Sequence, residues 1–326
     1  MVALGVDLGY GRVKSVVGER RRHWAAAWAP AGGEAFGIGS AAAPLVLDGR
    51  PMLVGDRAAA RPGAHRPFGD GRLSDPEAVP LLAQGLWEAG VQGDVVLGSG
   101  MPLGFFLQER EAARRALLGR AFRLGDGRSE TTVRIARLVL RPQGVGAALW
   151  LLQAGRLPED DGYVVVLDVG ARTVDVLTCD ASDMTPVDGL SFSLESGLAA
   201  AAGRVAAQAQ AETGHLPPPD LAERALLAEE RRGPAVRWYG RPLGGAAQAL
   251  DAVAGDIRAE VARRFGPDAG RVAAVAIVGG GGVLLAERLA GILPGGAVVL
   301  TAEEALFANA LGFAWAAGQA AAREGV

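Results

Sequence analysis

Cysteine is almost absent from this chain of 326 residues, because Cys179 is the only one. A single cysteine excludes an intrachain disulfide, and His23, His65 and His215 are too far apart in sequence to suggest a zinc site. No basic stretch or cleavage site of a signal peptide precedes the apolar run that begins at Val2. We therefore expect a cytoplasmic protein without a structural metal.

A strong excess of positive charge is also missing, since the net charge is −3. Direct binding of nucleic acid would need a basic stripe, so any contact with DNA would have to run through a partner. Residues 305–322 carry no charge and approach the length of a bilayer-spanning helix. They are mostly alanine, however, and Leu306, Phe307, Ala310 and Phe313 follow the spacing of one buried helical face. We predict a packed terminal helix and no membrane contact.

Half of the residues are hydrophobic, so a chain of this length can bury cores for about two domains. Residues 2–17 and 163–178 share one pattern: an apolar strand, Asp-x-Gly, a tight turn and a second strand. They lie about half the chain apart, which indicates a duplicated domain. A buried strand is expected over 272–278, followed by a glycine run and a helix from Val283. Because strand and helix patterns alternate throughout, we predict an α/β fold.

Local signals place several further element ends. Thr301, with Glu304 three residues later, forms a capping box that predicts the start of the final helix. Asp220 is expected to cap a helix after a run of prolines. Residues 99–102 are expected to close a strand with a turn, and residues 24–28 are expected to form a third strand. Residues from about 30 to 80 are rich in Gly, Pro and Ala, and we expect an inserted small subdomain there.

Lysine occurs once, at Lys14, and every other basic side chain among 33 is arginine. Arginine carries its charge on a planar fork, whereas lysine places a compact ammonium on a flexible stem that suits a phosphate as a point charge. Lys14 lies in the second strand of the first hairpin, just after Asp7-Leu8-Gly9-Tyr10-Gly11. The single lysine therefore stands beside a glycine-containing turn.

The glycine turns of the two hairpins suit phosphate binding. Successive backbone N–H groups bind phosphate best where no side chain stands in the way, and Gly9, Gly11 and Gly170 meet that condition. A carboxylate beside phosphate would repel it unless a cation stood between, and Mg²⁺, which keeps several waters, is the natural cation. Asp7 and Asp168 are paired candidates for holding hydrated Mg²⁺. Taken singly, each Asp-x-Gly is more typical of an ordinary turn.

A third glycine-rich segment, Gly279–Gly282, follows the strand expected over 272–278. It lacks the Gly-x-Gly-x-x-Gly pattern with a following acid that marks a dinucleotide site. The order hairpin, hairpin, strand-to-helix resembles the actin, Hsp70 and sugar-kinase superfamily, with the hairpins as phosphate-1 and phosphate-2 loops and residues 277–282 as the adenosine loop. The resemblance covers nearly the whole chain. The first turn, residues 142–147 and residues 307–313 are most similar to bacterial and archaeal actin-like proteins of the ParM/StbA plasmid-segregation type.

The resemblance implies two RNase-H-like domains with a nucleotide cleft between them: residues 1–143 plus 300–326, and residues 144–299. It implies slow, Mg²⁺-dependent hydrolysis of ATP, with GTP possible, coupled to a head-to-tail filament that an adaptor protein links to DNA. Gln143 would orient the attacking water, with Asp168 as the second catalytic residue, and Asp7 and Asp168 would hold Mg²⁺ through water. The implied nucleotide-binding residues are Gly9, Tyr10, Gly11, Lys14, Gly170, Ala171, Arg172, Thr173, Gly279, Gly280 and Gly281.

Two departures from the family pattern carry consequences. Tyr10 stands where many members have Ser or Thr, so backbone N–H groups must serve the phosphate there. Ala171 replaces the common Gly or Ser of the second loop, and Arg172 beside it is expected to point to solvent. A sugar-type small-molecule kinase is the alternative function, although it would need a carboxylate base where Gln143 stands. A scaffold that binds nucleotide without turnover is a third.

Overall fold

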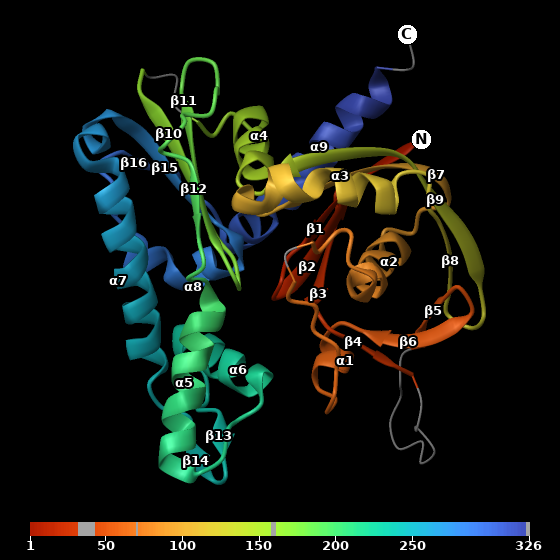
Figure 1. Ribbon diagram of the computed structural model, residues 1–326, viewed down its shortest axis with the longest axis horizontal. Helices are drawn as coiled ribbons and strands as arrows, with labels where there is room; N and C mark the ends of the chain where they lie inside the picture. The colour runs from red at the N-terminus through yellow and green to blue at the C-terminus, as the bar shows by residue number, and fades with distance from the viewer. Residues whose placement is uncertain (32–42, 70, 158–160, 324–326) are drawn as a thin grey trace. The chain divides into compact units, whose positions relative to one another are not determined.

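The computed structural model describes residues 1–31, 43–69, 71–157 and 161–323 (Figure 1). The chain divides into two compact units: the first unit is Met1–Trp150 with Asn309–Val326, and the second unit is Leu151–Ala308. The domain limits expected from the sequence, at 143 and 300, stay a prediction. The expected subdomain of about residues 30–80 falls partly outside the described residues, because 32–42 and 70 are not described.

Nine strands of the described residues form the sheet of the first unit. They are β1 (Val2–Leu8), β2 (Arg12–Val17), β3 (Arg20–Ala25), β4 (Trp28–Pro30), β5 (Leu45–Leu47), β6 (Arg50–Val54), β7 (Gly93–Met101), β8 (Ala121–Gly125) and β9 (Glu130–Pro142). Their order is β3-β2-β1-β7-β9-β8-β5-β6-β4, and β7 is parallel to both β1 and β9. The helical segments that begin in this unit are α1 (Asp56–Ala59), η1 (Pro76–Ala78), α2 (Val79–Glu88), η2 (Leu103–Phe105), α3 (Phe106–Leu117) and α4 (Val145–Gln153).

The two faces of β1 meet different helices, because successive side chains of a strand point to opposite sides. Val6 lies in one core with Leu81 and Leu86 of α2. Gly5, one residue earlier, lies against the long C-terminal helix α9 (Ala302–Ala322), where a Cβ atom would come within 2.1 Å of the Ala310 carbonyl oxygen. Asp7 follows Gly5 by two residues, so its side chain projects on the α9 face.

The second unit has a five-stranded sheet in the order β12-β11-β10-β15-β16 and a small β13-β14 hairpin. The strands are β10 (Tyr163–Val169), β11 (Val174–Asp180), β12 (Phe192–Leu194), β13 (Arg237–Trp238), β14 (Arg241–Pro242), β15 (Val272–Val278) and β16 (Gly296–Ala297). The helices are α5 (Leu198–Thr213), α6 (Pro219–Glu230), α7 (Ala246–Phe265) and α8 (Gly279–Leu289), with η3 (Gly266–Arg271) after α7. Residues of β10, β11, α5, α6, α7 and α8 share one core.

Several elements lie where the sequence predicted them. The strand over 272–278 is β15, and both repeated hairpins form, as β1–β2 and β10–β11. The capping box is confirmed, since the Glu304 N–H donates to Thr301 Oγ1 at 3.2 Å and the Thr301 N–H donates to Glu304 Oε2 at 2.8 Å. Ala310 and Ala314 of the final helix lie against Gly5 of β1, and Phe313 and Ala317 lie against Gly98 of β7. In the described part of the chain, no helix has both the length and the apolar character to cross a bilayer.

Four local predictions are wrong. The helix expected from Val283 begins at Gly279, because the glycine run forms its first turn. Asp220 lies inside α6 rather than capping it, since Pro219 takes the first helical position. Residues 99–101 continue β7 alongside β9 instead of turning, and the strand expected over 24–28 is divided between β3 and β4.

The close approach of α9 to the sheet gives a prediction at Gly98 of β7. A Cβ atom there would lie 2.0 Å from the Phe313 carbonyl oxygen, which belongs to the helix backbone and cannot turn aside. Gly98→Ala should lower the free energy of unfolding by about 2 kcal/mol or more, because an overpacked core must shift. Urea unfolding would measure it.

The matched control is Gly203→Ala in α5, where a Cβ atom meets nothing within 4 Å. Alanine is favoured over glycine in a helix, so this variant should unfold at the same or higher urea concentration. Equal effects of the two substitutions would contradict the packing described here.

Candidate functional site

The first hairpin holds a buried ion pair. Asp7 and Lys14 are directly opposite each other in the β1–β2 register, so their side chains lie on the same face. The Lys14 ammonium Nζ is 2.9 Å from Asp7 Oδ2, and the two residues are 7% and 3% exposed. The single lysine of the chain is therefore neutralised by the carboxylate that ends the first strand.

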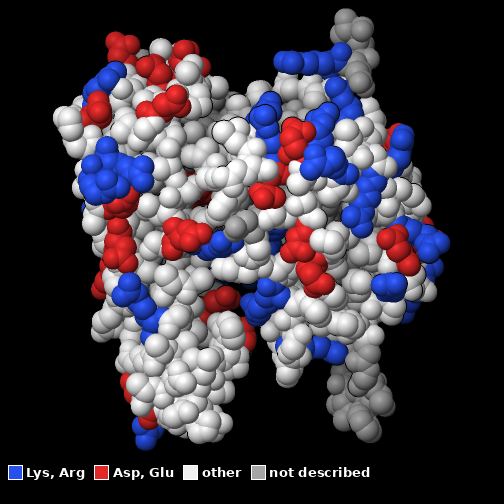
Figure 2. Space-filling view, in the orientation of Figure 1, with Lys and Arg blue, Asp and Glu red and all other residues white. Residues whose placement is uncertain are grey.

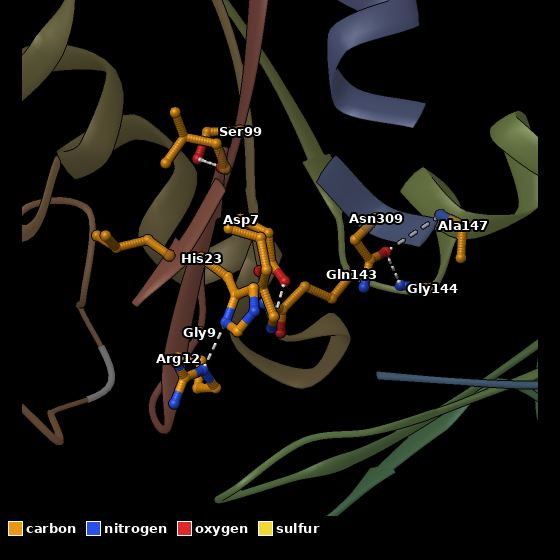
Figure 3. A network of polar contacts seen from close by, with 12 residues as sticks. Asp7, Gly9, Arg12, His23, Ser99, Gln143, Gly144, Ala147 and Asn309 are labelled. Atoms are coloured by element: carbon orange, nitrogen blue, oxygen red, sulfur yellow. Dashed lines mark hydrogen bonds and ion pairs between the residues drawn. The ribbon is translucent and has the colours of Figure 1, made fainter. Parts of the chain in front are cut away.

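The other oxygen of the same carboxylate binds Gln143, which follows the last residue of β9. Gln143 Nε2 donates to Asp7 Oδ1 at 2.9 Å, and the Gln143 backbone N–H donates to the Met101 carbonyl at 2.8 Å (Figure 3). Both ends of Gln143 are thus fixed. Three residues predicted from the sequence, Asp7, Lys14 and Gln143, come together in the first unit.

Asn309, the only asparagine of the chain, holds the residues that follow Gln143. Its Oδ1 accepts from the N–H groups of Gly144 at 3.0 Å and Ala147 at 3.1 Å, and the side chain is buried (Figure 3). These N–H groups belong to the start of α4, where a helix has no partners of its own for them. Asn309 therefore caps α4 from another helix.

The turn after β1 is closely packed around Gly9. A Cβ atom at Gly9 would lie 2.7 Å from the Arg12 carbonyl oxygen and 3.1 Å from Lys14 Nζ, so only glycine leaves this space open beside the ammonium. Tyr10 stands where many family members have a short hydroxyl side chain. Its own hydroxyl donates to the Gly69 carbonyl at 3.0 Å.

Arg12, at the far end of the turn, makes contacts that the sequence did not suggest. Its guanidinium forms two hydrogen bonds with Asp56, at 3.2 and 3.3 Å, and its Nε donates to His23 Nδ1 at 2.8 Å. Burial, together with the Arg12 charge, lowers the pKa of His23 below its ordinary value. A neutral imidazole can accept the Arg12 bond, so His23 supports the turn as an uncharged group.

The second hairpin repeats this geometry with a different charge. Asp168 lies opposite Asp175 in the β10–β11 register, and both carboxylates are buried. Ser193 on β12 donates to Asp175 Oδ1. Asp175 therefore occupies the position that Lys14 has in the first hairpin. The predicted site did not include Asp175, although it follows Asp168 by the same seven residues that separate Lys14 from Asp7.

The turn after β10 is supported by the start of α5. The Gly170 N–H donates to the Thr173 carbonyl at 2.9 Å, while the carbonyls of Gly170 and Ala171 accept from Leu198 and Ala199 at 3.1 and 2.7 Å. The expectation that Arg172 points to solvent is wrong: its guanidinium pairs with Glu195 at 3.1 Å and is only 18% exposed.

The glycine run of α8 lies against the end of β10. A Cβ atom at Gly279, which has φ +86°, would be 2.4 Å from Asp168 Oδ1, and one at Gly281 would be 2.6 Å from Val169 Cγ1. Gly280 has more room, with Leu306 3.7 Å away. The second unit thus brings Asp168, its turn and the N-terminus of α8 together.

Comparisons with known proteins agree with this arrangement. A family model for the N-terminal domain of actin-like proteins matches residues 5–146, and one for the C-terminal part of an archaeal MreB-like actin homologue matches residues 166–291. Archaeal actin homologues of Thermoplasma volcanium and Thermoplasma acidophilum are each 38% identical over 324 residues, which cover 96% of this chain and 98% of those proteins. The chain belongs to the actin-like ATPase superfamily.

Solved structures support the same membership and the predicted fold class. A crystal structure of an archaeal actin homologue in complex with ADP has a TM-score of 0.84 and 37% identity, covering 98% of this chain and all of that one. A 15-stranded ParM filament from Clostridium botulinum has a TM-score of 0.82 at 19% identity, covering 98% of this chain and 99% of that one, which shows the shared fold alone. The actin fold expected from the three glycine-rich segments is confirmed.

The ion pair of this actin homologue gives a stability prediction. Lys14→Met keeps the length of the side chain but leaves the Asp7 carboxylate buried with Gln143 as its remaining side-chain donor. The free energy of unfolding should fall by about 3 kcal/mol or more, since removing one partner of a buried pair strands the other charge. The double variant Asp7→Asn with Lys14→Met should recover part of that loss.

Arg204→Met is the matched control, because Arg204 and Asp256 form a pair of 3.1 Å in which both side chains are half exposed. Its loss should cost less than about 1 kcal/mol. Urea unfolding of all three variants tests the comparison, and a Lys14→Met effect as small as that of Arg204→Met would contradict a buried, coupled pair.

Proposed function

We propose that this protein binds and slowly hydrolyses ATP with Mg²⁺, and that nucleotide turnover controls its assembly into filaments. The observation that carries the proposal is the Asp7 carboxylate held by Lys14 and Gln143 beside the glycine-containing turn. The ADP complex of the relative at 37% identity supports the nucleotide class. GTP is the second nucleotide to test.

The residues present fit a bound polyphosphate. The Lys14 ammonium stands beside the Gly9 turn in the first unit, where it can neutralise phosphate oxygens as a point charge. The Gly170 N–H already donates to the Thr173 carbonyl, so we assign the phosphates to Lys14 and to the turn amides at 9–11 and 171–173, and the nucleoside to residues 279–281.

The carboxylates fit a cation that keeps its water ligands better than a cation that they bind directly. Both oxygens of Asp7 already accept hydrogen bonds, so Asp7 has little capacity for a direct metal bond but can accept from metal-bound water. Asp168 faces a second carboxylate, Asp175, and like charges placed opposite each other are stabilised by a nearby cation. Bound Mg²⁺ would supply charge neutralisation for the triphosphate.

Gln143 is assigned to the attacking water. Its amide nitrogen is committed to Asp7, so the carbonyl oxygen of the same amide is the end that can accept a hydrogen bond from water. Phosphoryl transfer depends mainly on positioning and charge, and an amide that cannot act as a base is sufficient for slow hydrolysis.

Assembly and cargo are the finer part of the proposal. Head-to-tail contacts that do not close generate an open filament, and the ParM filament has the same fold. Charges of both signs are interspersed over the face drawn in Figure 2 and the net charge is −3, so we assign any role in DNA or plasmid segregation to an adaptor protein.

Sedimentation with and without ATP and Mg²⁺ tests this function. We expect a pellet that forms with ATP and Mg²⁺ and decays as phosphate is released, because a ligand shifts assembly only through its different affinity for the two states. ADP production that depends on an added sugar, without a pellet, would instead favour the kinase. The absence of both a pellet and phosphate release would contradict the proposal.

Gln143→Ala tests the assignment of the water-positioning group. Phosphate release should slow by roughly 10- to 100-fold, with ATP affinity nearly unchanged and the pellet longer lived. The control is Gln153→Ala, an exposed glutamine at the end of α4, which should hydrolyse ATP at the unaltered rate. Normal phosphate release by Gln143→Ala would remove this assignment.

A further inference from the structure

Arg72 is a buried charge in the first unit that no role described so far uses. It is 3% exposed, and within the described part of the chain its hydrogen bonds go to backbone carbonyls. Nε donates to Leu8 O at 2.5 Å, Nη2 to Gly9 O at 2.8 Å, and Nη1 to Pro67 O. Burial lowers the pKa of Arg72 to about 10, so the guanidinium stays charged at neutral pH.

Two of these carbonyls belong to the turn that follows Asp7. Their peptide groups are trans, so the C=O of one residue points opposite to the N–H of the next. With Leu8 O and Gly9 O directed at Arg72, the N–H groups of Gly9 and Tyr10 are directed away from it. Successive N–H groups on one side of a turn form a concave site for anions.

Further contacts hold Arg72 against this turn. The guanidinium lies 4.8 Å from the centre of the Tyr10 ring, and the Tyr10 hydroxyl donates to Gly69 O, three residues before Arg72. Gly69 and Arg72 are therefore both fastened to the turn. On the other side of Gly9, a Cβ atom would lie 3.1 Å from Lys14 Nζ.

The second hairpin holds one equivalent carbonyl with a different donor. Gly170, like Gly9, follows its aspartate by two residues, and its carbonyl accepts from the N–H of Leu198 at 3.1 Å at the start of α5. The next carbonyl, of Ala171, accepts from Ala199. In both halves of the duplication, donors behind the turn fix the direction of its peptide groups. A helix start does this in the second unit, and one arginine does it in the first.

We propose that Arg72 is a positioning residue for the polyphosphate of the nucleotide, acting by turning the N–H groups of Gly9 and Tyr10 toward it. The inference rests on the proposed nucleotide binding and names a residue through which that site is built. Arg72 itself stays on the opposite side of the turn. This positioning role of Arg72 explains how a turn with tyrosine at position 10, in place of a short hydroxyl, still presents N–H donors to phosphate.

The test compares Arg72→Lys with the wild-type protein. Lysine keeps the charge but not the planar fork, so it cannot hold two successive carbonyls in the same directions. We expect affinity for ATP, and for inorganic tripolyphosphate as a probe without a nucleoside, to fall about tenfold or more. Affinity for adenosine should stay within about twofold, since adenosine has no phosphate to meet the turn.

An NMR spectrum of the backbone amides supplies a second readout, which would not change in this way if Arg72 had a merely structural role. In the wild-type protein the Gly9 and Tyr10 amide resonances should shift when tripolyphosphate is added, and in Arg72→Lys that shift should be largely lost. Arg66→Lys is the matched control, because Arg66 lies in the same part of the chain but donates to Ala59 O, away from the turn. It should bind like the wild-type protein.

Each outcome decides the proposal. Equal losses of affinity for ATP and adenosine in Arg72→Lys would show a general loss of structure. Unchanged tripolyphosphate affinity would show that Arg72 does not orient the turn. Either result overturns the inference about Arg72 while the proposed nucleotide binding stands. A wild-type protein that binds neither ATP nor tripolyphosphate would overturn both. If Arg72→Lys does not fold, Tyr10→Phe is the second variant, because it removes the hydroxyl that donates to Gly69 O. It should lower tripolyphosphate affinity and leave adenosine affinity unchanged, and no change in tripolyphosphate affinity would overturn the inference.

Discussion

The buried carboxylate of Asp7 is the group on which the functional end of the first unit depends. One oxygen accepts from Lys14 on the neighbouring strand, and the other accepts from Gln143 at the end of β9. A buried charge without partners costs several kcal/mol, so burial of this carboxylate requires hydrogen-bond donors beside it. The same requirement fixes where the ammonium and the amide stand, which ties the stability of the unit to the geometry of the site.

That constraint extends along the chain through backbone contacts. The residue after Gln143 is Gly144, whose N–H is held by Asn309, and the same amide oxygen accepts from Ala147 to cap α4. A helix usually takes its cap from a residue beside it in sequence. Here the cap comes from α9, so the end of β9, the start of α4 and the C-terminal helix are set relative to one another by one side chain inside the first unit.

The parts of the fold that could be predicted are those with local causes. The apolar run over 272–278 predicted β15 with these bounds. The predicted start of α8 was wrong because packing overrides helix propensity. Glycine is a poor helix former, yet glycine is needed at Gly279 because a side chain there would collide with Asp168. Arg72 had no local signal, since the two turn carbonyls that it holds, Leu8 O and Gly9 O, are more than 60 residues away along the chain, and every residue has a carbonyl.

The two halves of the duplication retain the direction of the peptide groups while their side chains differ. Lys14 and Asp175 occupy equivalent places with opposite charge. The equivalent carbonyls of Gly9 and Gly170 accept from chemically different donors, which are Arg72 and the Leu198 N–H. A backbone N–H is present whatever the side chain, so a turn that binds anions through N–H groups tolerates exchange of its side chains provided that something behind it holds the carbonyls. Tyr10 in place of a short hydroxyl is therefore compatible with a working turn, because its ring and its hydroxyl both contact the segment that carries the donor.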